Sequence, residues 1–357
     1  MHLYSSFMSI YIVILLFLLV CSLLNPYIRK DIRMVTNLFF AGFFVLALLG
    51  GLRKNVGFDY WSYAELYKQS AELYNMKEKG FIWLVEIFNN LHLPFVAFCI
   101  LFSFLSVYLA FRFILRNSPY VFFSILMYFS LGNYYFSTFN VVRQALAAVI
   151  FMNLLPSIEK KSFWSYFIIL LITAWTVHFT VLILIPLYFF LRKEWSIFSK
   201  ILFLGNVIVL NSVLIVIIEN SPYSIYLKFE SFASAVSPTY YLMAMFGLTV
   251  CFFEWKHPNW QKEHILFCNL NYLTILLIYL VFANENTPLV MVINRILGYF
   301  TLIYVVLLPM LFAEMKLFSN RCIFIVLCSI IFAFLFYWAL SQNGENHLMI
   351  PYTTIFS

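Results

Sequence analysis

Long apolar runs separated by short polar segments dominate the chain. The runs lack the strict apolar–polar alternation of an outer-membrane β-strand, and most approach the roughly 20 residues that a helix needs to cross a bilayer. Because backbone groups in lipid must form their hydrogen bonds within the chain, the runs predict transmembrane helices. The predicted spans are residues 4–24, 34–52, 93–115, 120–137, 139–155, 163–190, 197–218, 240–253, 265–283, 296–312 and 322–340.

The run at residues 163–190 is too long for one crossing and too short for two comfortable ones. A break near His178 would divide it into two short helices that reach both sides of the membrane. Short cytoplasmic loops collect Lys and Arg, so the loops can test the two alternatives. With the break, most of the 22 basic residues fall on the cytoplasmic side, whereas without it every later loop changes sides. The break is therefore favoured, and it brings the total to about 12 crossings with both termini outside.

Composition agrees with a membrane protein. Of the 357 residues, 64% are hydrophobic and only 10% are charged, whereas a soluble domain carries about 25% charged residues. The six cysteines fall within apolar runs rather than outer loops, which gives no sign of a disulfide framework or a cysteine metal site. We therefore predict an all-α fold, a polytopic integral membrane helical bundle. Residues 1–357 would form a single transmembrane domain with a large outer loop at about 53–92.

The outer loop contains a stripe of tyrosines. Tyr60, Tyr63, Tyr67 and Tyr74 recur at offsets that place them on one face of a helix. Tyrosine favours the membrane interface, so one interpretation is an amphipathic helix that lies on the membrane with an aromatic belt. The other interpretation is a platform for saccharide, because aromatic faces pack well on sugar C–H surfaces. The sequence leaves both open.

Three arginines, Arg53, Arg143 and Arg295, stand at the outer face, opposite most of the other charges. A charge within the membrane is costly and is usually kept to bind something. Guanidinium groups bind phosphate oxygens bidentately and keep their charge, so a cluster of them suits a lipid-linked pyrophosphate. Structural alternatives remain: Arg143 could pair with a distant carboxylate such as Asp59 or Glu86, and Arg53 could simply snorkel to the interface.

His178 adds a group that can take a proton at neutral pH, although a buried histidine bonded to a neighbour is the alternative. The chain has only two aspartates, Asp31 and Asp59, so no paired-aspartate motif is present to hold a divalent metal for a nucleotide-sugar donor. A Gly-rich phosphate loop is also missing from the sequence. Nucleotide substrates are therefore disfavoured, and the donor must carry its own activation, as a polyprenyl pyrophosphate does.

Several short motifs follow one another along the outer side of the predicted bundle. They are Arg53-x-x-x-Gly57-x-Asp59-Tyr60-x-x-Tyr63, Arg143-Gln144-Ala-Leu-Ala, His178, Arg295-x-x-x-Tyr299-Phe300 and Pro351-Tyr352. Together they resemble the EpsG/Wzy-like family of O-antigen and exopolysaccharide polymerases, from residue 53 to the end of the chain. Two positions depart from the family pattern: Phe58 stands where a smaller residue is expected, and Thr180 where serine is common.

The resemblance implies a membrane glycosyltransferase with a GT-C-like fold in the bacterial cytoplasmic (inner) membrane, with its active site facing the periplasm. Such an enzyme transfers the growing glycan from undecaprenyl pyrophosphate to a sugar hydroxyl of a new lipid-linked repeat unit. The implied partners are that lipid-linked oligosaccharide, membrane lipid, a chain-length regulator and a flippase. No cofactor, metal or nucleic acid is implied.

With this reaction as the hypothesis, we expect roles for individual residues. His178 would be the base for the acceptor hydroxyl, with Asp59 as the rival candidate. Arg143, Arg53 and Arg295 would stabilise the charge that develops on the departing pyrophosphate, an electrostatic role that needs no metal. The other residues predicted to bind substrate are Gly57, Tyr60, Tyr63, Gln144, Tyr299 and Tyr352.

Two other functions remain open. A flippase or transporter of lipid-linked oligosaccharide would also present arginines to a lipid-linked anion, but it is expected to line a midplane cavity with charges and to show internal repeats. A membrane ligase or acyltransferase of cell-envelope glycans would share the outward arginines and the histidine. Extension of a purified lipid-linked repeat unit would separate a polymerase from a flippase.

Overall fold

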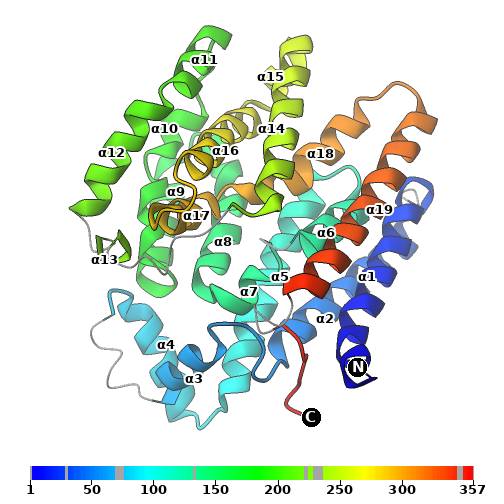
Figure 1. Cartoon of the computed structure of the whole chain (residues 1–357), viewed down its shortest axis with the longest axis vertical. Helices are drawn as coiled ribbons and strands as arrows, with labels where there is room; N and C mark the ends of the chain where they lie inside the picture. Colours follow the sequence, from blue (N-terminus) through cyan, green and yellow to red (C-terminus); the bar gives the residue numbers. More distant parts are fainter. Residues whose placement is uncertain are drawn as a thin grey trace. The chain divides into compact units, whose positions relative to one another are not determined.

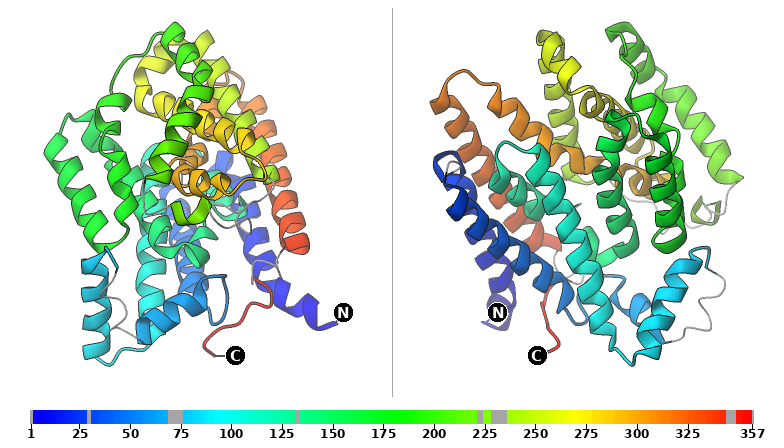
Figure 2. Two further views of the ribbon diagram at one scale, coloured as in Figure 1. Left: turned by 60° about the vertical axis from the view of Figure 1, so that its left-hand side comes forward. Right: turned by 180° about the vertical axis from the view of Figure 1, so that it is seen from behind.

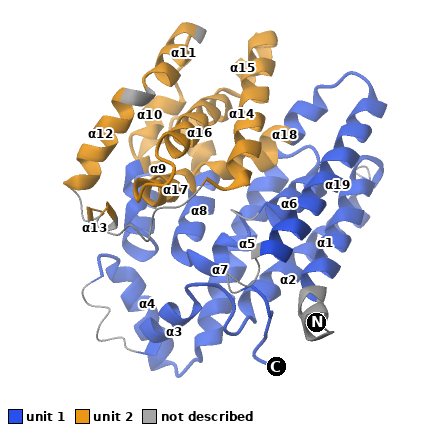
Figure 3. Ribbon diagram, in the orientation of Figure 1, with its two compact units in different colours: residues 1–153, 167–183, 309–357 blue, residues 154–166, 184–308 orange. Residues whose placement is uncertain are grey.

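The computed structural model describes residues 2–28, 31–68, 76–131, 134–220, 224–227, 236–343 and 349–356. Most of these residues are helical, and the described part of the chain contains no strand beyond one isolated β-bridge (Figure 1). The all-α prediction is therefore confirmed. The chain divides into two compact units, each made from more than one stretch of sequence (Figure 3).

The first unit comprises residues 1–153, 167–183 and 309–357. Its helices are α1 (His2–Ile28), α2 (Ile32–Gly51), α3 (Tyr60–Lys68), α4 (Lys79–Asn90), α5 (Phe95–Asn117), α6 (Val121–Ser130), α7 (Ser137–Asn140) and α19 (Phe318–Asn343), with parts of α8 (Val142–Glu159), α9 (Phe163–Thr176), η2 (Phe179–Leu184) and α18 (Tyr304–Ala313). Helix α1 packs against α6 and α19, and α2 packs against α5. Asn25 of α1 accepts a hydrogen bond of 2.7 Å from the Phe122 N–H, which satisfies a donor in the first turn of α6.

The second unit comprises residues 154–166 and 184–308. Its helices are α10 (Leu187–Leu191), α11 (Ile197–Gly205), α12 (Val207–Glu219), α13 (Ser224–Leu227), α14 (Pro238–Lys256), α15 (Pro258–Glu263), α16 (Ile265–Ala283), α17 (Leu289–Leu297) and η4 (Thr301–Ile303). Helix α16 is its central element, because α10, α11, α12, α14 and α17 all pack against it.

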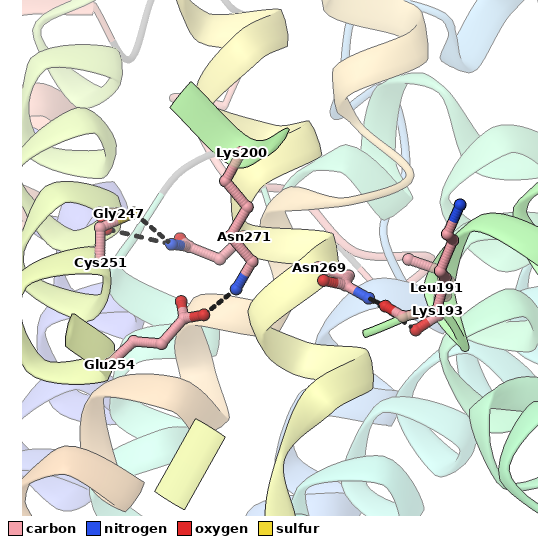
Figure 4. Close-up of polar contacts among 8 residues, drawn as sticks. All are labelled: Leu191, Lys193, Lys200, Gly247, Cys251, Glu254, Asn269 and Asn271. Atoms are coloured by element: carbon pink, nitrogen blue, oxygen red, sulfur yellow. Dashed lines mark hydrogen bonds and ion pairs between the residues drawn. The ribbon is translucent and has the colours of Figure 1, made fainter. Parts of the chain in front are cut away.

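Two asparagines of α16 bind the backbones of neighbouring elements (Figure 4). Asn269 donates to the carbonyls of Leu191 and Lys193, at 2.8 and 2.9 Å, where α10 ends. Asn271 donates to the Gly247 carbonyl of α14 at 3.0 Å. Both side chains are buried, so these bonds satisfy carbonyls that water does not reach.

A buried ion pair joins α11 to α14 in the same unit. The Lys200 ammonium donates to a carboxylate oxygen of Glu254 (Figure 4). The same ammonium lies 4.6 Å from the centre of the Tyr272 ring, within the range of a cation–π contact. Because both charges are buried, removal of either one would leave the other without compensation.

Within the described residues, five helical segments are long and apolar enough to cross a membrane, and the number rises to seven if each of two bent helix pairs counts as one span. The five are Ile10–Ile28, Ile32–Gly51, Phe95–Asn117, Ile265–Ala283 and Phe318–Gln342. They coincide with five of the predicted spans and make the chain a multi-pass membrane protein. The predicted total of about 12 crossings also counts shorter helices, among them α6 and α9.

The predicted break near His178 is confirmed. Helix α9 ends at Thr176, and the 3₁₀ helix η2 begins at Phe179. The His178 N–H donates to the Thr173 carbonyl at 3.0 Å, and its own carbonyl accepts the Val181 N–H at 3.2 Å. His178 therefore lies in the turn between two helical segments.

Three runs predicted as continuous spans are broken instead. The run at residues 120–137 is helical as α6 only as far as Ser130, and α7 begins at Ser137. The run at residues 296–312 contains the end of α17, and the chain bends by 43° between Leu289–Leu297 and Thr301–Ala313. Gly298 follows α17 directly, and glycine is a poor helix former because it loses the most backbone freedom on folding. The run at residues 197–218 is interrupted between α11 and α12, at Asn206, which follows Gly205 and is also a weak helix former.

Candidate active site

Arg53 follows the end of α2 and is buried, with only 4% of its surface exposed. Its guanidinium carbon lies 4.7 Å from the centre of the Phe139 ring, and Nη1 donates to the Gly50 carbonyl. Nε makes no hydrogen bond, and no carboxylate in the described part of the chain lies within ion-pair distance of this side chain. Arg53 thus carries a buried positive charge compensated by an aromatic face and a carbonyl. Its burial distinguishes it from an arginine that snorkels to water.

The segment at residues 349–356 holds the backbone on both sides of Arg53. The Lys54 N–H donates to the Thr353 carbonyl at 2.9 Å, and the Ile355 N–H donates to the Leu52 carbonyl at 3.1 Å. These bonds form a short antiparallel bridge between segments that lie about 300 residues apart in the sequence. The position of Arg53 therefore depends on the C-terminal segment.

Tyr352 ties the same segment to α2. Its hydroxyl donates to the Leu49 carbonyl at 2.8 Å, and its ring meets the Tyr11 ring edge to face, with the centroids 5.5 Å apart. Burial raises the pKa of Tyr352 to about 12, and the positive charge of Arg53 lowers it only in part. The hydroxyl therefore stays protonated and able to donate.

The loop that follows Arg53 is fitted against α7. Gly57 has a φ of 98°, and a Cβ at this position would lie 2.6 Å from the Phe139 carbonyl oxygen. Both the backbone conformation and the close approach require glycine. The Phe58 N–H donates to the Asn140 side-chain oxygen at 2.6 Å, and the Phe58 side chain is 65% exposed. A large residue at position 58 therefore meets no steric obstacle, although the family pattern suggests a smaller one.

Asp59 is half-buried at the position before α3. Two tyrosines of the predicted stripe pack into the protein next to it. Tyr60 meets Phe95 of α5 edge to face, with ring centres 5.4 Å apart, and Tyr67 lies against Phe95 and Phe98 at 5.5 and 5.8 Å. Figure 2 shows α3 and α4 beside the start of α5. The rings of Tyr60 and Tyr67 therefore attach α3 to α5.

Tyr63 is the half-buried member of the stripe, one turn from Tyr60. Tyr74 lies outside the described residues. A helix that presents its tyrosines partly to protein has fewer aromatic faces to offer a sugar. Tyr63 is the ring of α3 that best keeps the predicted substrate-binding role.

Arg143, Glu78 and His178 come together in the first unit. The Arg143 Nη1 lies 3.3 Å from Glu78 Oε2, and the His178 Nδ1 lies 3.5 Å from Glu78 Oε1, so both nitrogens stand within ion-pair distance of the carboxylate without the geometry of a hydrogen bond. The Phe179 N–H also donates to Oε1, at 3.0 Å. On its other side, the Arg143 guanidinium lies 4.9 Å from the centre of the Phe81 ring. Residues of α8 and of the α9–η2 turn therefore converge on the carboxylate of Glu78, which directly precedes α4.

This carboxylate is ionised although it is only 7% exposed. Burial alone raises the pKa of Glu78, but the contact with His178, the Phe179 N–H and the charge of Arg143 together outweigh burial and lower the pKa to about 2. A negative charge therefore stands beside the imidazole and the guanidinium at every physiological pH.

Gly80 explains how Glu78 reaches this place. It lies in the first turn of α4, and a Cβ on it would come within 2.7 Å of the Trp175 ring and 2.9 Å of Thr176. The bare backbone thus lets the start of α4 approach the end of α9. Glu78 precedes Gly80 by two residues and His178 follows Thr176 by two, so this close approach brings them together.

Glu78 is the site residue that sequence reasoning missed. The sequence suggested Asp59 or Glu86 as a distant partner of Arg143, whereas the ion pair in the structure is with Glu78. Glu78 lies in the stretch Met-Lys-Glu-Lys-Gly, which looks like a solvated charge run. The one available signal was Gly80, an isolated glycine at the start of an apolar helix, which is typical of close backbone approach.

The remaining predicted residues lie as follows. Gln144 is buried beside Arg143 in α8, and Thr180 is half-buried in η2. Arg295 is half-buried in the last turn of α17, and Tyr299 is buried just beyond that helix. These last two belong to the second unit, and the predicted roles of both stay predictions.

Among the residues that the structure describes, no group of three or more His, Cys, Asp or Glu side chains could hold a metal ion. In comparisons with known proteins, a family model described as the EpsG family matches residues 36–354. This match covers nearly the whole chain and includes Arg53, Glu78, Arg143 and His178. Searches of curated proteins and of solved structures return no match.

Proposed function

The chain belongs to the EpsG family, and from that premise we propose that it is a repeat-unit polymerase of O-antigen or exopolysaccharide. It would act at the periplasmic face of the bacterial cytoplasmic membrane. It would take the growing glycan from undecaprenyl pyrophosphate and transfer it to a sugar hydroxyl of a new lipid-linked repeat unit. A GT-C-like arrangement of about 12 crossings belongs to the same proposal, as do a chain-length regulator and a flippase as partners.

The observation that supports the proposal most is the juxtaposition of Arg143 and His178 across Glu78. The reaction needs a permanent positive charge for the departing pyrophosphate and a base for the attacking hydroxyl. Arg143 supplies the first and His178 the second, within one cluster. Arg143 also lies in the first turn of α8, where unpaired backbone N–H groups and the helix dipole favour an anion.

We assign the transfer step to these two residues. A lone pair of His178 takes the proton of the acceptor hydroxyl, and the hydroxyl oxygen forms a bond to the anomeric carbon of the donor glycan. The bond between that carbon and the pyrophosphate oxygen breaks, and its electron pair leaves with the lipid pyrophosphate. Arg143 stabilises the added negative charge by charge-assisted hydrogen bonds.

Arg53 supports the same role. Its buried guanidinium has no ion-pair partner in the described chain, and Arg53 packs on Phe139, four residues before Arg143. An anion that bound there would compensate a charge now held by a ring and a carbonyl. Asp59 remains the rival base, and a variant of Asp59 can be tested in the reconstituted assay described below. The contribution of Arg295 is a prediction from the sequence alone.

Reconstitution tests the proposal. Purified protein in liposomes receives a purified undecaprenyl-pyrophosphate-linked repeat unit as its sole substrate, and the products are separated on a gel. We expect a ladder of glycans that grows by whole repeat units. Arg143→Ala should insert normally and yield no ladder, whereas Arg116→Ala, at an exposed arginine of α5, should yield a normal one. The absence of a ladder from the wild type would overturn the polymerase proposal, and a normal ladder from Arg143→Ala would remove Arg143 from the transfer step.

The other candidate functions give different results in the same vesicles. A flippase would move the repeat unit to the opposite leaflet and leave its length unchanged. A ligase or acyltransferase would modify the unit only when a different acceptor or an acyl donor was added. Either result would replace the polymerase proposal.

A further inference from the structure

We propose that Glu78 is a positioning residue that holds the Nδ1 of His178 and leaves the Nε2 to act as the base. This inference rests on the proposed function, since it assigns a role within the same transfer step. Glu78 would not touch the substrate. It would act through His178.

The two oxygens of the Glu78 carboxylate have different partners. Oε1 faces the His178 Nδ1 and accepts the Phe179 N–H, whereas Oε2 faces Arg143. A carboxylate that served only to neutralise Arg143 would have no need of the bond to the Phe179 backbone. That bond fixes Oε1 at the residue next to His178, so the carboxylate is oriented with respect to the imidazole.

Orientation by an ionised carboxylate determines the tautomer of the imidazole. A neutral histidine has one N–H and one lone pair, and an ionised carboxylate can only accept a hydrogen bond. The nitrogen that faces Glu78 must then carry the hydrogen. The lone pair lies on Nε2, on the opposite side of the ring, where it can receive a proton from an acceptor hydroxyl.

Glu78 itself is a poor candidate for the base. Its carboxylate takes up a proton only in strong acid, because its pKa is about 2, far below the pH at which an effective base must work. Both of its oxygens are also occupied by partners from the protein. The base is therefore the histidine that this carboxylate holds.

The proton can be followed through one turnover. The acceptor hydroxyl gives its proton to Nε2 as the new glycosidic bond forms and the pyrophosphate departs. His178 then carries two N–H groups and a positive charge next to the negative charge of Glu78. The charged groups around it are Glu78, Arg143 and Lys77, whose ammonium lies 4.7 Å from the centre of the Phe179 ring. Loss of the Nε2 proton to water restores the base.

The first test reads the tautomer directly. Protein labelled with ¹⁵N-histidine, in lipid at a pH where imidazole is neutral, gives nitrogen signals that distinguish Nδ1–H from Nε2–H. The signal missing from His178→Gln identifies His178. We expect Nδ1–H in the wild type and in Glu65→Gln, an exposed glutamate of α3 that serves as the matched control. Glu78→Gln should give Nε2–H or a mixture, and an unchanged Nδ1–H signal in that variant would overturn the proposal.

The second test is kinetic. Glu78→Gln should lower kcat on the order of 100-fold with little change in KM, because a badly oriented base slows the transfer step and leaves substrate binding unchanged. The acid limb of its pH–rate profile should move to lower pH, since His178 loses the negative charge that favours its protonated form. Glu78→Asp keeps the charge and should recover part of kcat. A wild-type kcat and pH profile for Glu78→Gln would overturn the positioning role.

The two tests separate this inference from the proposed function. If the wild-type protein extends no repeat unit, the polymerase proposal fails, while the tautomer comparison still decides the role of Glu78. If the wild type polymerises and Glu78→Gln does so equally well, the positioning role alone fails. If Glu78→Gln does not insert into the membrane, Glu78→Asp replaces it in both tests. A mixed tautomer in Glu78→Asp together with a wild-type kcat would overturn the proposal, because the orientation of His178 would then not matter for the rate.

Discussion

Gly80 lies so close to Trp175 that a single methyl group on it would come within 2.7 Å of the indole ring. The contact joins the start of α4 to the end of α9 and places Glu78 next to His178. A residue with no side chain therefore controls the geometry of the candidate site.

Replacement of Gly80 by alanine should test this relationship. The new methyl group must push α4 away from α9, with a loss of about 1–3 kcal/mol in the free energy of unfolding and a larger loss of polymerase activity. Gly205→Ala is the matched control, since nothing lies within 4 Å of the position of its Cβ. Unfolding temperature and ladder formation are measured for both. Equal behaviour of the two variants would contradict the role of Gly80.

Gly57→Ala should also destabilise the protein, here through backbone strain as well as a close contact. Alanine at a φ of 98° is strained, and its Cβ would meet the Phe139 carbonyl oxygen at 2.6 Å. We expect a loss of at least about 1 kcal/mol in stability and displacement of the loop that carries Asp59. Gly42→Ala, where the nearest atoms lie at an ordinary 3.8 Å, is the control. Thermal unfolding of the two variants is the measurement, and equal unfolding temperatures would contradict the need for glycine at position 57.

Arg143→Ala separates a structural ion pair from an anion site. The single substitution leaves the buried Glu78 carboxylate without its cation, so stability should fall by about 1–3 kcal/mol, a range discounted for the 17% exposure of Arg143. The double variant Arg143→Ala/Glu78→Ala should regain most of that stability and remain inactive. If the double variant polymerises normally, the arginine is only structural.

The C-terminal segment should be required for activity through Arg53. A chain truncated after Ile350 loses the bonds from Lys54, Thr353 and Ile355 that hold the backbone at Arg53. Truncation after Ile355 retains them and removes Phe356, which is 82% exposed. We expect the first truncation to lower activity at least about tenfold and the second to leave it near the wild-type level. Similar ladders from the two chains would contradict this dependence.

Stability should fall in acid through Glu78. The pKa of Glu78 is about 2 in the folded protein and 4.5 for the unperturbed group, so the folded state favours the ionised form. The stabilisation is present above about pH 4.5 and is lost as the pH falls towards 2. Unfolding temperatures between pH 2 and 6 should therefore drop more steeply for the wild type than for Glu78→Gln. Parallel curves would show that the carboxylate contributes nothing.

Patterns of local character predicted much of the fold. The apolar runs located the long helices because hydropathy is read from a short stretch of sequence, and the distribution of basic residues along the later loops predicted the break at His178. The same signals missed the bends after Leu297 and at Asn206. Hydropathy does not register a turn inside an apolar run.

The candidate site was predicted less completely. Arg143 and His178 stood out because charge is rare in apolar helices. Glu78 did not, since its neighbours in sequence are lysines and its partners lie 65 and 100 residues further along. Only the approach of α4 to α9 reveals it. The burial of Tyr60 and Tyr67 against α5 was equally hidden, because a helical stripe does not say what it faces.

The Glu78 carboxylate faces Arg143 with one oxygen and His178 with the other, and this sharing has a thermodynamic consequence. Arg143 and His178 share one negative charge, so an anion that draws Arg143 away from Oε2 leaves more of that charge to the imidazole. By linkage, protonation of His178 must change the anion affinity of Arg143 by the same factor by which the anion changes the proton affinity of His178. In the proposed mechanism, donor binding and proton uptake would therefore be coupled, and the base would become stronger when the leaving group is in place.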